Sequence, residues 1–181
     1  MKNIYIPLLV TFLVCIACSK DDSNTSWKDE NEAFFHELAT RSDLNKIEAG
    51  SKGGVIYYRV IQSGSPDQPS PIYNGHAVDV FYRGVTLLGF DKQHDAIVSG
   101  KEFDTTFKPA NLTGVDTYAP VRLQLTSVIE GWREALQRMK KGDKWQIYIP
   151  WQLGYKDQQQ SAIPAYSTLI FEIELISIYE L

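Results

Sequence analysis

The sequence predicts an α+β domain, an antiparallel sheet with one helix packed against a face, preceded by a separate N-terminal helix. Short segments rich in β-branched and aromatic residues alternate between apolar and polar positions, as half-buried strands do. A single helical stripe interrupts these segments, whereas a parallel sheet would need a helix after each strand. The length of 181 residues suits one domain of this kind.

Composition narrows the range of functions. The net charge is −4 with acidic and basic residues interspersed, so no nucleic-acid partner is expected. Cys15 and Cys18 both lie in or beside an apolar run, which makes a redox pair or half a zinc site the less favoured alternative and leaves the domain without a disulfide. His36, His76 and His94 are scattered, so neither a metal nor a cofactor is expected.

Residues 1–17 are predicted to be a lipoprotein signal peptide. Lys2 is followed by about 14 apolar residues, fewer than the roughly 20 of a spanning helix. Ala17-Cys18 at the end of this run resembles a bacterial lipobox, which implies lipidation of Cys18 and a membrane anchor. Cys15 stands where a lipobox usually has Leu, so a secreted protein or an uncleaved anchor remain as alternatives.

Residues 19–22, Ser-Lys-Asp-Asp, are similar to the short signal that sends lipoproteins to the cell surface in Bacteroidetes-type bacteria. The expected location is therefore the cell envelope, at the outer membrane and on its surface face. A solvated tether is the alternative for these four residues, and the periplasmic face the alternative location.

A flexible tether is expected over residues 18–26, which are rich in Ser, Asp and Asn. The following segment, residues 27–50, is predicted to begin with a helix from Trp27 to about Ser42, capped by Ser26. An apolar stripe of Phe34, Phe35 and Leu38 favours packing on the domain. Dimerisation through this helix is the alternative, and the oligomeric state is left open.

The domain proper is expected over residues 51–181. Its predicted strands cover residues 55–61, 78–82, 121–125, 144–150 and 168–176, with a proline-rich loop over 63–74. Trp145, Ile147 and Ile149 alternate on one face and are interpreted as plain core. The helix is predicted over residues 129–139, with Gly142 as the left-handed residue after its end.

Seven motifs follow one another along this domain: Val80–Gly84, Gly100–Asp104, Val128–Leu136, Ile149–Pro150, Leu153–Tyr155, Ile163–Pro164 and Ser167–Leu175. In this order they resemble the signature of the FKBP-type peptidyl-prolyl isomerases, from Val55 to Leu181. The resemblance implies a twisted antiparallel sheet wrapped around one short helix, with a pocket between them. It also implies isomerisation of X-Pro bonds in exported or cell-envelope proteins, with proline-containing polypeptides as partners.

The resemblance further implies which residues form the site. Trp132 is expected at the pocket floor, although its helical spacing alone would place it in the core. The wall and rim residues implied are Tyr82, Phe103, Asp104, Val121, Val128, Ile129, Tyr155, Ile163 and Phe171. Among them, the backbone N–H of Ile129 is expected to face a carbonyl of the bound ligand.

Several positions depart from the family pattern. Extra residues over 87–99 are expected to bulge near the pocket rim, and the stretch from Phe103 to Pro120 is lengthened. Lys108 is the one basic residue there that could pair with Asp104, and Val121 stands where a phenylalanine is common. Two alternatives to the enzyme follow: a peptide-binding or chaperone module with little turnover, and a glycan-binding surface lipoprotein.

Overall fold

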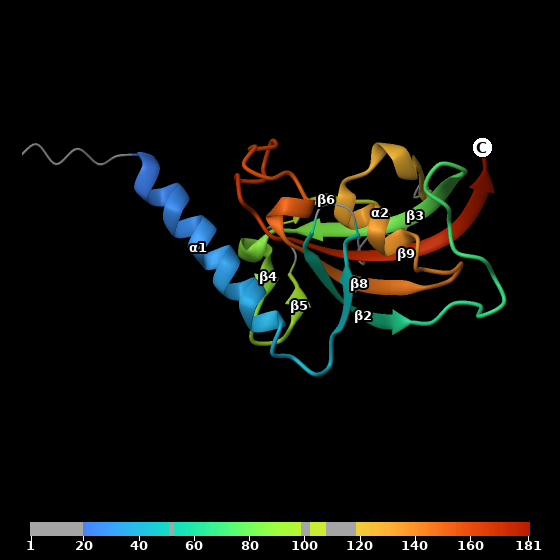
Figure 1. Ribbon diagram of the computed structural model, residues 1–181, viewed down its shortest axis with the longest axis horizontal. Helices are drawn as coiled ribbons and strands as arrows, with labels where there is room; N and C mark the ends of the chain where they lie inside the picture. The colour runs from blue at the N-terminus through green and yellow to red at the C-terminus, as the bar shows by residue number, and fades with distance from the viewer. Residues whose placement is uncertain (1–19, 51–52, 99–101, 108–118) are drawn as a thin grey trace, which may run out of the picture.

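The computed structural model describes residues 20–50, 53–98, 102–107 and 119–181 (Figure 1). An antiparallel sheet forms its centre, in the spatial order β1-β2-β8-β9-β3-β6, and β7 pairs with β3 beside β6. The strands are β1 (Asn45–Glu48), β2 (Val55–Gln62), β3 (His76–Val85), β6 (Glu102–Thr105), β7 (Val121–Gln124), β8 (Lys144–Ile149) and β9 (Leu169–Glu180). Together with the helices α1 (Lys20–Leu38) and α2 (Glu130–Leu136), this sheet confirms the predicted α+β class.

The main core lies between α2 and the face of the sheet that curls around it (Figure 1). Trp145, Ile147 and Ile149 are buried there, as predicted for plain core. Gly131 allows the close approach of α2 to β8, since a Cβ at this position would lie 2.3 Å from Cγ2 of Ile149. The helix is shorter than predicted, because it ends at Leu136 and a turn of Gln137 and Arg138 separates it from Met139.

Gly142 has a positive φ of 88°, in agreement with the left-handed conformation expected of it. Its place differs from the prediction, because it lies in the turn that leads into β8 and not directly after α2. A Cβ at Gly64 would lie 2.2 Å from the carbonyl oxygen of Lys141, so the turn before β8 packs tightly on the loop that follows β2.

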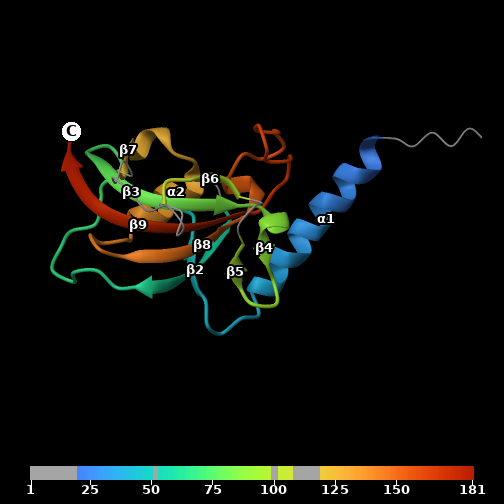
Figure 2. The same cartoon turned by 180° about the vertical axis from the view of Figure 1, so that it is seen from behind.

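A second core covers the opposite face of the sheet. Alternation along β8 places Tyr148 there while its neighbour Ile147 faces α2. Phe34 and Leu38 of α1 pack on this face, so the apolar stripe of the N-terminal helix covers its own domain, as favoured from the sequence. Figure 2 shows α1 together with the small hairpin of β4 (Phe90–Asp91) and β5 (Ala96–Ile97) at one end of the sheet.

The hairpin corrects the expectation for residues 87–99. Leu87 and Phe90 pack in the second core, so this insertion covers the face opposite the pocket and does not bulge at the pocket rim. The insertion takes this side of the sheet because β3 ends with Val85 pointing away from α2 into the second core. The turn η1 (Leu87–Gly89) then continues on the same face of the sheet.

Helix α1 corrects the predicted tether. It begins at Lys20, so Ser26 lies within the helix and does not cap it. Residues 20–38 contain neither Gly nor Pro, so no helix-breaking residue interrupts this stretch. The helix ends at Leu38, and tighter hydrogen bonds to carbonyls three residues back continue through Arg41, close to the predicted end. Cys18 lies outside the described residues.

Charged groups tie the hairpin to the second core. Asp95 accepts hydrogen bonds from Arg41 at 2.9 Å and from the Tyr148 hydroxyl at 2.7 Å, and it lies 2.6 Å from Arg59. Arg59 also donates to Gln146 at 2.6 Å, and Gln146 donates to Tyr148 at 3.0 Å. Burial opposes ionisation of Asp95, but the hydrogen bonds and the two arginine charges outweigh it and hold the pKa of its carboxyl below the ordinary value.

No helix within the described ranges is both long and apolar enough to cross a membrane.

Candidate active site

A pocket of about 230 Å³ lies between α2 and the concave face of the sheet. Strands β3, β6, β7 and β9, the turn before α2 and the loop after β8 all contribute to it. Its lining residues are Tyr82, Phe103, Asp104, Leu123, Ser127, Val128, Ile129, Trp132, Tyr155 and Phe171. This volume is below the roughly 300–1,000 Å³ of sites for drug-sized ligands, so it suits one or two residues of an extended chain.

Four aromatic rings form the floor and one wall of the pocket. Trp132 meets Tyr82 and Phe171 edge to face, with centroid distances of 5.1 Å in each pair. Phe103 meets Phe171 in the same way at 5.5 Å. Edge-to-face contacts are the favoured geometry for aromatic pairs, so each ring holds its neighbours in place.

A β-bulge brings two adjacent residues of β6 into the pocket. Gly84 of β3 opposes Asp104, but Val85 opposes Glu102, which leaves Phe103 as the extra residue. Alternation alone would send Phe103 and Asp104 to opposite faces. Gly84 is needed for the same arrangement, because a Cβ there would lie 2.5 Å from the Phe171 ring and 2.7 Å from the Phe103 ring.

The polar groups of the pocket lie at its rim. The Tyr82 hydroxyl donates a hydrogen bond to the Asp104 carboxylate. Burial, this hydrogen bond and the carboxylate charge all raise the pKa of Tyr82, and burial together with the same charge raises the pKa of Tyr155. Both phenols therefore stay protonated at neutral pH and remain hydrogen-bond donors. Lys108, the predicted partner of Asp104, lies outside the described residues.

Ile129 immediately precedes α2. Its carbonyl accepts the N–H of Arg133 at 3.1 Å, so its backbone is fixed by the first turn of the helix. The described residues that line the pocket include no histidine and no lysine. The lining offers apolar walls and a few hydrogen-bond donors.

Most of the predicted site residues meet in this pocket. Eight of them line it: Tyr82, Phe103, Asp104, Val128, Ile129, Trp132, Tyr155 and Phe171. Val121 and Ile163 do not line it, although both pack in the same main core as most of the lining residues. Leu123 and Ser127 were missed, although the strict alternation of residues 121–125 already placed Leu123 on the same face as Val121. The sequence carried no comparable signal for Ser127.

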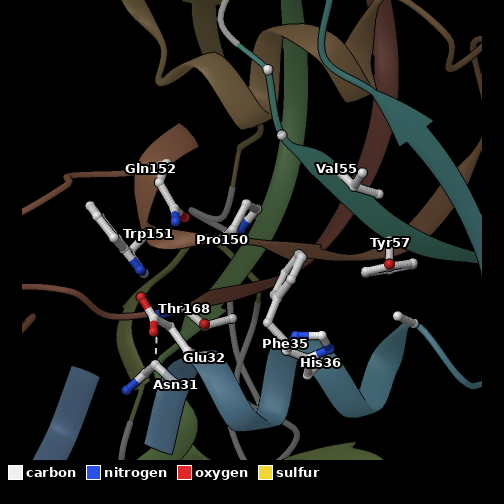
Figure 3. Close-up of a pocket in the computed structure, with 13 residues that line it drawn as sticks. Asn31, Glu32, Phe35, His36, Val55, Tyr57, Pro150, Trp151, Gln152 and Thr168 are labelled. Atoms are coloured by element: carbon white, nitrogen blue, oxygen red, sulfur yellow. Dashed lines mark hydrogen bonds between the residues drawn. The ribbon is translucent and has the colours of Figure 1, made fainter. Parts of the chain in front are cut away.

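A larger hollow of about 600 Å³, here called the α1 groove, lies between α1, the start of β2 and the turn η3 (Trp151–Leu153) (Figure 3). Phe35, Tyr57, Pro150 and Trp151 form much of its lining. None of the predicted site residues lies there. The smaller pocket is therefore the candidate active site, because the predicted site residues line it, although the α1 groove is larger.

Comparison with known proteins agrees with this assignment. The sequence profile of the FKBP-type peptidyl-prolyl cis-trans isomerases matches residues 69–176, more than half of the chain. The chain belongs to this family. Eight residues of its motifs line one pocket in the folded chain.

Two FKBP-type relatives illustrate the extent of the similarity. A probable FKBP-type peptidyl-prolyl cis-trans isomerase of Haemophilus influenzae is 33% identical over 152 residues, which are 83% of this chain and 52% of the relative. The peptidyl-prolyl cis-trans isomerase Mip of Coxiella burnetii is 35% identical over 137 residues, 74% of this chain and 50% of the relative. The chain therefore spans about half the length of these relatives.

Two solved structures share the fold. The crystal structure of FkpA from Escherichia coli has a TM-score of 0.66 at 25% identity, covering 88% of this chain and 62% of FkpA. A peptidyl-prolyl cis-trans isomerase from Pseudomonas syringae has a TM-score of 0.63 at 26% identity, covering 86% of this chain and 95% of the other.

Proposed function

We propose that this chain is a peptidyl-prolyl cis-trans isomerase that assists the folding of exported or cell-envelope proteins. The observation that carries the proposal is the aromatic pocket with Trp132 at its floor and the Tyr82–Asp104 pair at its rim. Its size and apolar lining suit a proline ring, and the Tyr155 hydroxyl at its rim suits a carbonyl group beside that ring.

The physical chemistry of the X-Pro bond suits such a pocket. Rotation breaks amide resonance, and the barrier of about 18–20 kcal/mol makes isomerisation slow, although trans is favoured by only about 0.5–1 kcal/mol. The planar amide is more dipolar than the twisted one. A pocket poor in water therefore disfavours the planar ground state relative to the twisted transition state, and this difference accelerates rotation.

Proline-limited refolding tests the proposal. The full chain should accelerate the slow phase of a substrate whose refolding waits on an X-Pro bond. Phe103→Ala should lower this acceleration, whereas the matched truncation Leu88→Ala, at an exposed position on the opposite face, should leave it unchanged. Because truncating a buried aromatic can cost about 3–5 kcal/mol, circular dichroism must first show that Phe103→Ala is folded.

One feature favours a second candidate, a peptide-binding or chaperone module with little turnover. Leu123 lines the pocket on the β7 side, and Val121 packs in the core where the family pattern commonly has an aromatic residue. One aromatic wall is thereby missing. Binding of a proline peptide that depends on Trp132, without any acceleration of refolding, would select this candidate.

The proposed location at the outer membrane rests on the N-terminal residues that precede the folded domain. Cys18, as the lipid-bearing residue, would lie two residues before the start of α1. Figure 1 shows the first turns of α1 leading away from the sheet. Because α1 packs on the domain from Trp27 onward, residues 20–26, about 10 Å of helix, would project toward the outer membrane and hold the pocket away from it, open to large polypeptides.

A further inference from the structure

The loop between β8 and β9, residues 150–168, carries Tyr155 into the pocket. Three of its residues other than glycine have a left-handed backbone: Lys156 with φ 60°, Ser161 with φ 44° and Tyr166 with φ 61°. Such conformations are unfavourable for residues with a Cβ and persist only where the surrounding structure enforces them. The conformation of this loop therefore depends on contacts that hold it in place.

Helix α1 supplies contacts at the C-terminal end of the loop. The indole N–H of Trp27 donates to the Ser167 hydroxyl at 3.1 Å. The backbone N–H of Thr168 donates to the side-chain oxygen of Asn31 at 2.6 Å, the dashed line of Figure 3. Asn31 is fully buried, and its amide nitrogen donates to the carbonyl of Trp27 at 2.7 Å. One buried amide thus joins the helix to the loop.

Helix α1 also contacts both flanks of the loop through one lysine. The Lys28 ammonium lies 5.5 Å from the ring centroid of Trp151 and 5.5 Å from that of Tyr166. The two rings meet edge to face at 5.2 Å. A cation over aromatic rings is attracted to their π faces, so Lys28 holds the two ends of the loop together.

Two hydrogen bonds connect this aromatic pair to the pocket. Lys156 donates its backbone N–H to the carbonyl of Trp151 at 2.9 Å, and its own carbonyl accepts the N–H of Tyr166 at 2.8 Å. The residue directly after Tyr155 is therefore hydrogen-bonded to the backbones of both residues whose rings Lys28 covers. A displacement of α1 would be transmitted to Tyr155 through this short chain of contacts.

We propose that α1 is a working part of the isomerase site, and that Trp27, Lys28 and Asn31 are positioning residues for Tyr155. By fixing the rim on the side of this loop, they set which residues next to proline the pocket accepts. The effect on substrate selectivity rests on the proposed isomerase function, whereas the positioning of Tyr155 by α1 rests on the contacts alone.

The first experiment measures the order of the loop and needs no activity. Amide hydrogen exchange of Lys156 and Tyr166 is followed in the full chain, in Lys28→Met and in Asn31→Ala. We expect exchange at least about tenfold faster in both variants, because the loop loses its external contacts. Glu30→Gln is the matched control, since Glu30 lies on the same helix but pairs with Lys92 of the hairpin region at 3.3 Å. Unchanged exchange in Lys28→Met, the variant less prone to unfolding, overturns the inference.

The second experiment measures selectivity with tetrapeptides that differ in the residue before proline. Partial unfolding lowers kcat/KM equally for all of them, so a purely structural role leaves their ratios unchanged. We expect the ratios to shift at least about threefold in Lys28→Met and Asn31→Ala, and the shift to vanish when Tyr155→Ala is added. Unshifted ratios, or a shift that persists without Tyr155, overturn the positioning role. A wild type without turnover contradicts the proposed function instead, and the same ratios are then taken from peptide dissociation constants.

Discussion

The Tyr82 hydroxyl donates a hydrogen bond to the Asp104 carboxylate, joining β3 to the bulge of β6 at the rim of the pocket. Both residues belong to motifs that are separated by an insertion, and the insertion leaves their meeting intact because it packs on the opposite face of the sheet.

Tyr82→Phe should lower kcat/KM several-fold while changing the free energy of unfolding by no more than about 1 kcal/mol, since one hydrogen bond at a partly exposed site is removed. Refolding catalysis and chemical denaturation measure the two effects. Tyr179→Phe is a matched control, because the Tyr179 hydroxyl donates to the Asp79 carboxylate at 2.9 Å outside the pocket. Equal losses of activity in both variants would argue against a role for the rim pair.

Gly84→Ala should disturb the Phe103 and Phe171 rings, because its Cβ would lie 2.5–2.7 Å from them. Overpacking of this kind costs about 1–3 kcal/mol, and we expect peptide binding to weaken as well. Thermal unfolding and peptide titration check both effects. In Gly75→Ala, where the new Cβ meets nothing within 4 Å, binding should be unchanged. Wild-type affinity in Gly84→Ala would show that the ring positions are not needed for binding.

Asp95→Asn should lower stability at pH 7 by about 2 kcal/mol, because Arg41, Arg59 and Tyr148 lose a charged partner. The folded-state pKa of Asp95 is depressed, so its contribution is present above the unfolded pKa of about 4 and is lost as the pH falls through the folded value.

Urea unfolding at pH 7 and pH 2 measures the effect of Asp95→Asn. The difference between the variant and wild type should shrink at the lower pH. Asp43→Asn, at an exposed carboxylate bonded to Arg41, is the control and should show a smaller difference at both pH values. A difference for Asp95→Asn that is the same at pH 2 and pH 7 would rule out its charge as the source.

Cys18→Ala should abolish incorporation of labelled fatty acid and leave the precursor unprocessed, because the proposed lipid attaches to the thiol of Cys18. Metabolic labelling followed by electrophoresis measures both outcomes. Cys15→Ala is the control and should keep the label. Label that persists in Cys18→Ala excludes this residue as the anchor.

Protease added to intact cells should remove the folded domain if Ser19 to Asp22 directs it to the surface. Immunoblotting of whole cells before and after digestion measures the loss, and a periplasmic protein serves as the control for intact membranes. Digestion only after lysis would place the domain on the periplasmic face.

Local patterns in the sequence predicted β2, β3, β7, β8, β9 and the α2 stripe, but they did not predict the short strands β1, β4, β5 and β6. The resemblance to the family, and not local pattern, supplied the eight pocket residues. Alternation along residues 144–149 predicted which side chains of β8 share the face toward α2, because successive side chains of a strand point to opposite faces. It did not predict that the other face of β8 is buried too. The family motifs then located Trp132, which helical spacing alone would have left as ordinary core. The start of α1 was predicted too late, because polar residues 20–26 have no apolar stripe and their helix shows only in the structure.

Only the tertiary structure decided how distant segments meet. The bulge that directs the side chains of Phe103 and Asp104 into the same pocket depends on the register between β3 and β6, which no local pattern encodes. The second core likewise depends on α1 and residues 87–97 reaching the same face of the sheet. Its polar network joins Arg41, Asp95 and Tyr148, which are far apart along the chain. Contacts between remote segments are set by packing and strand register together, so they follow from the whole fold and not from any one stretch of residues.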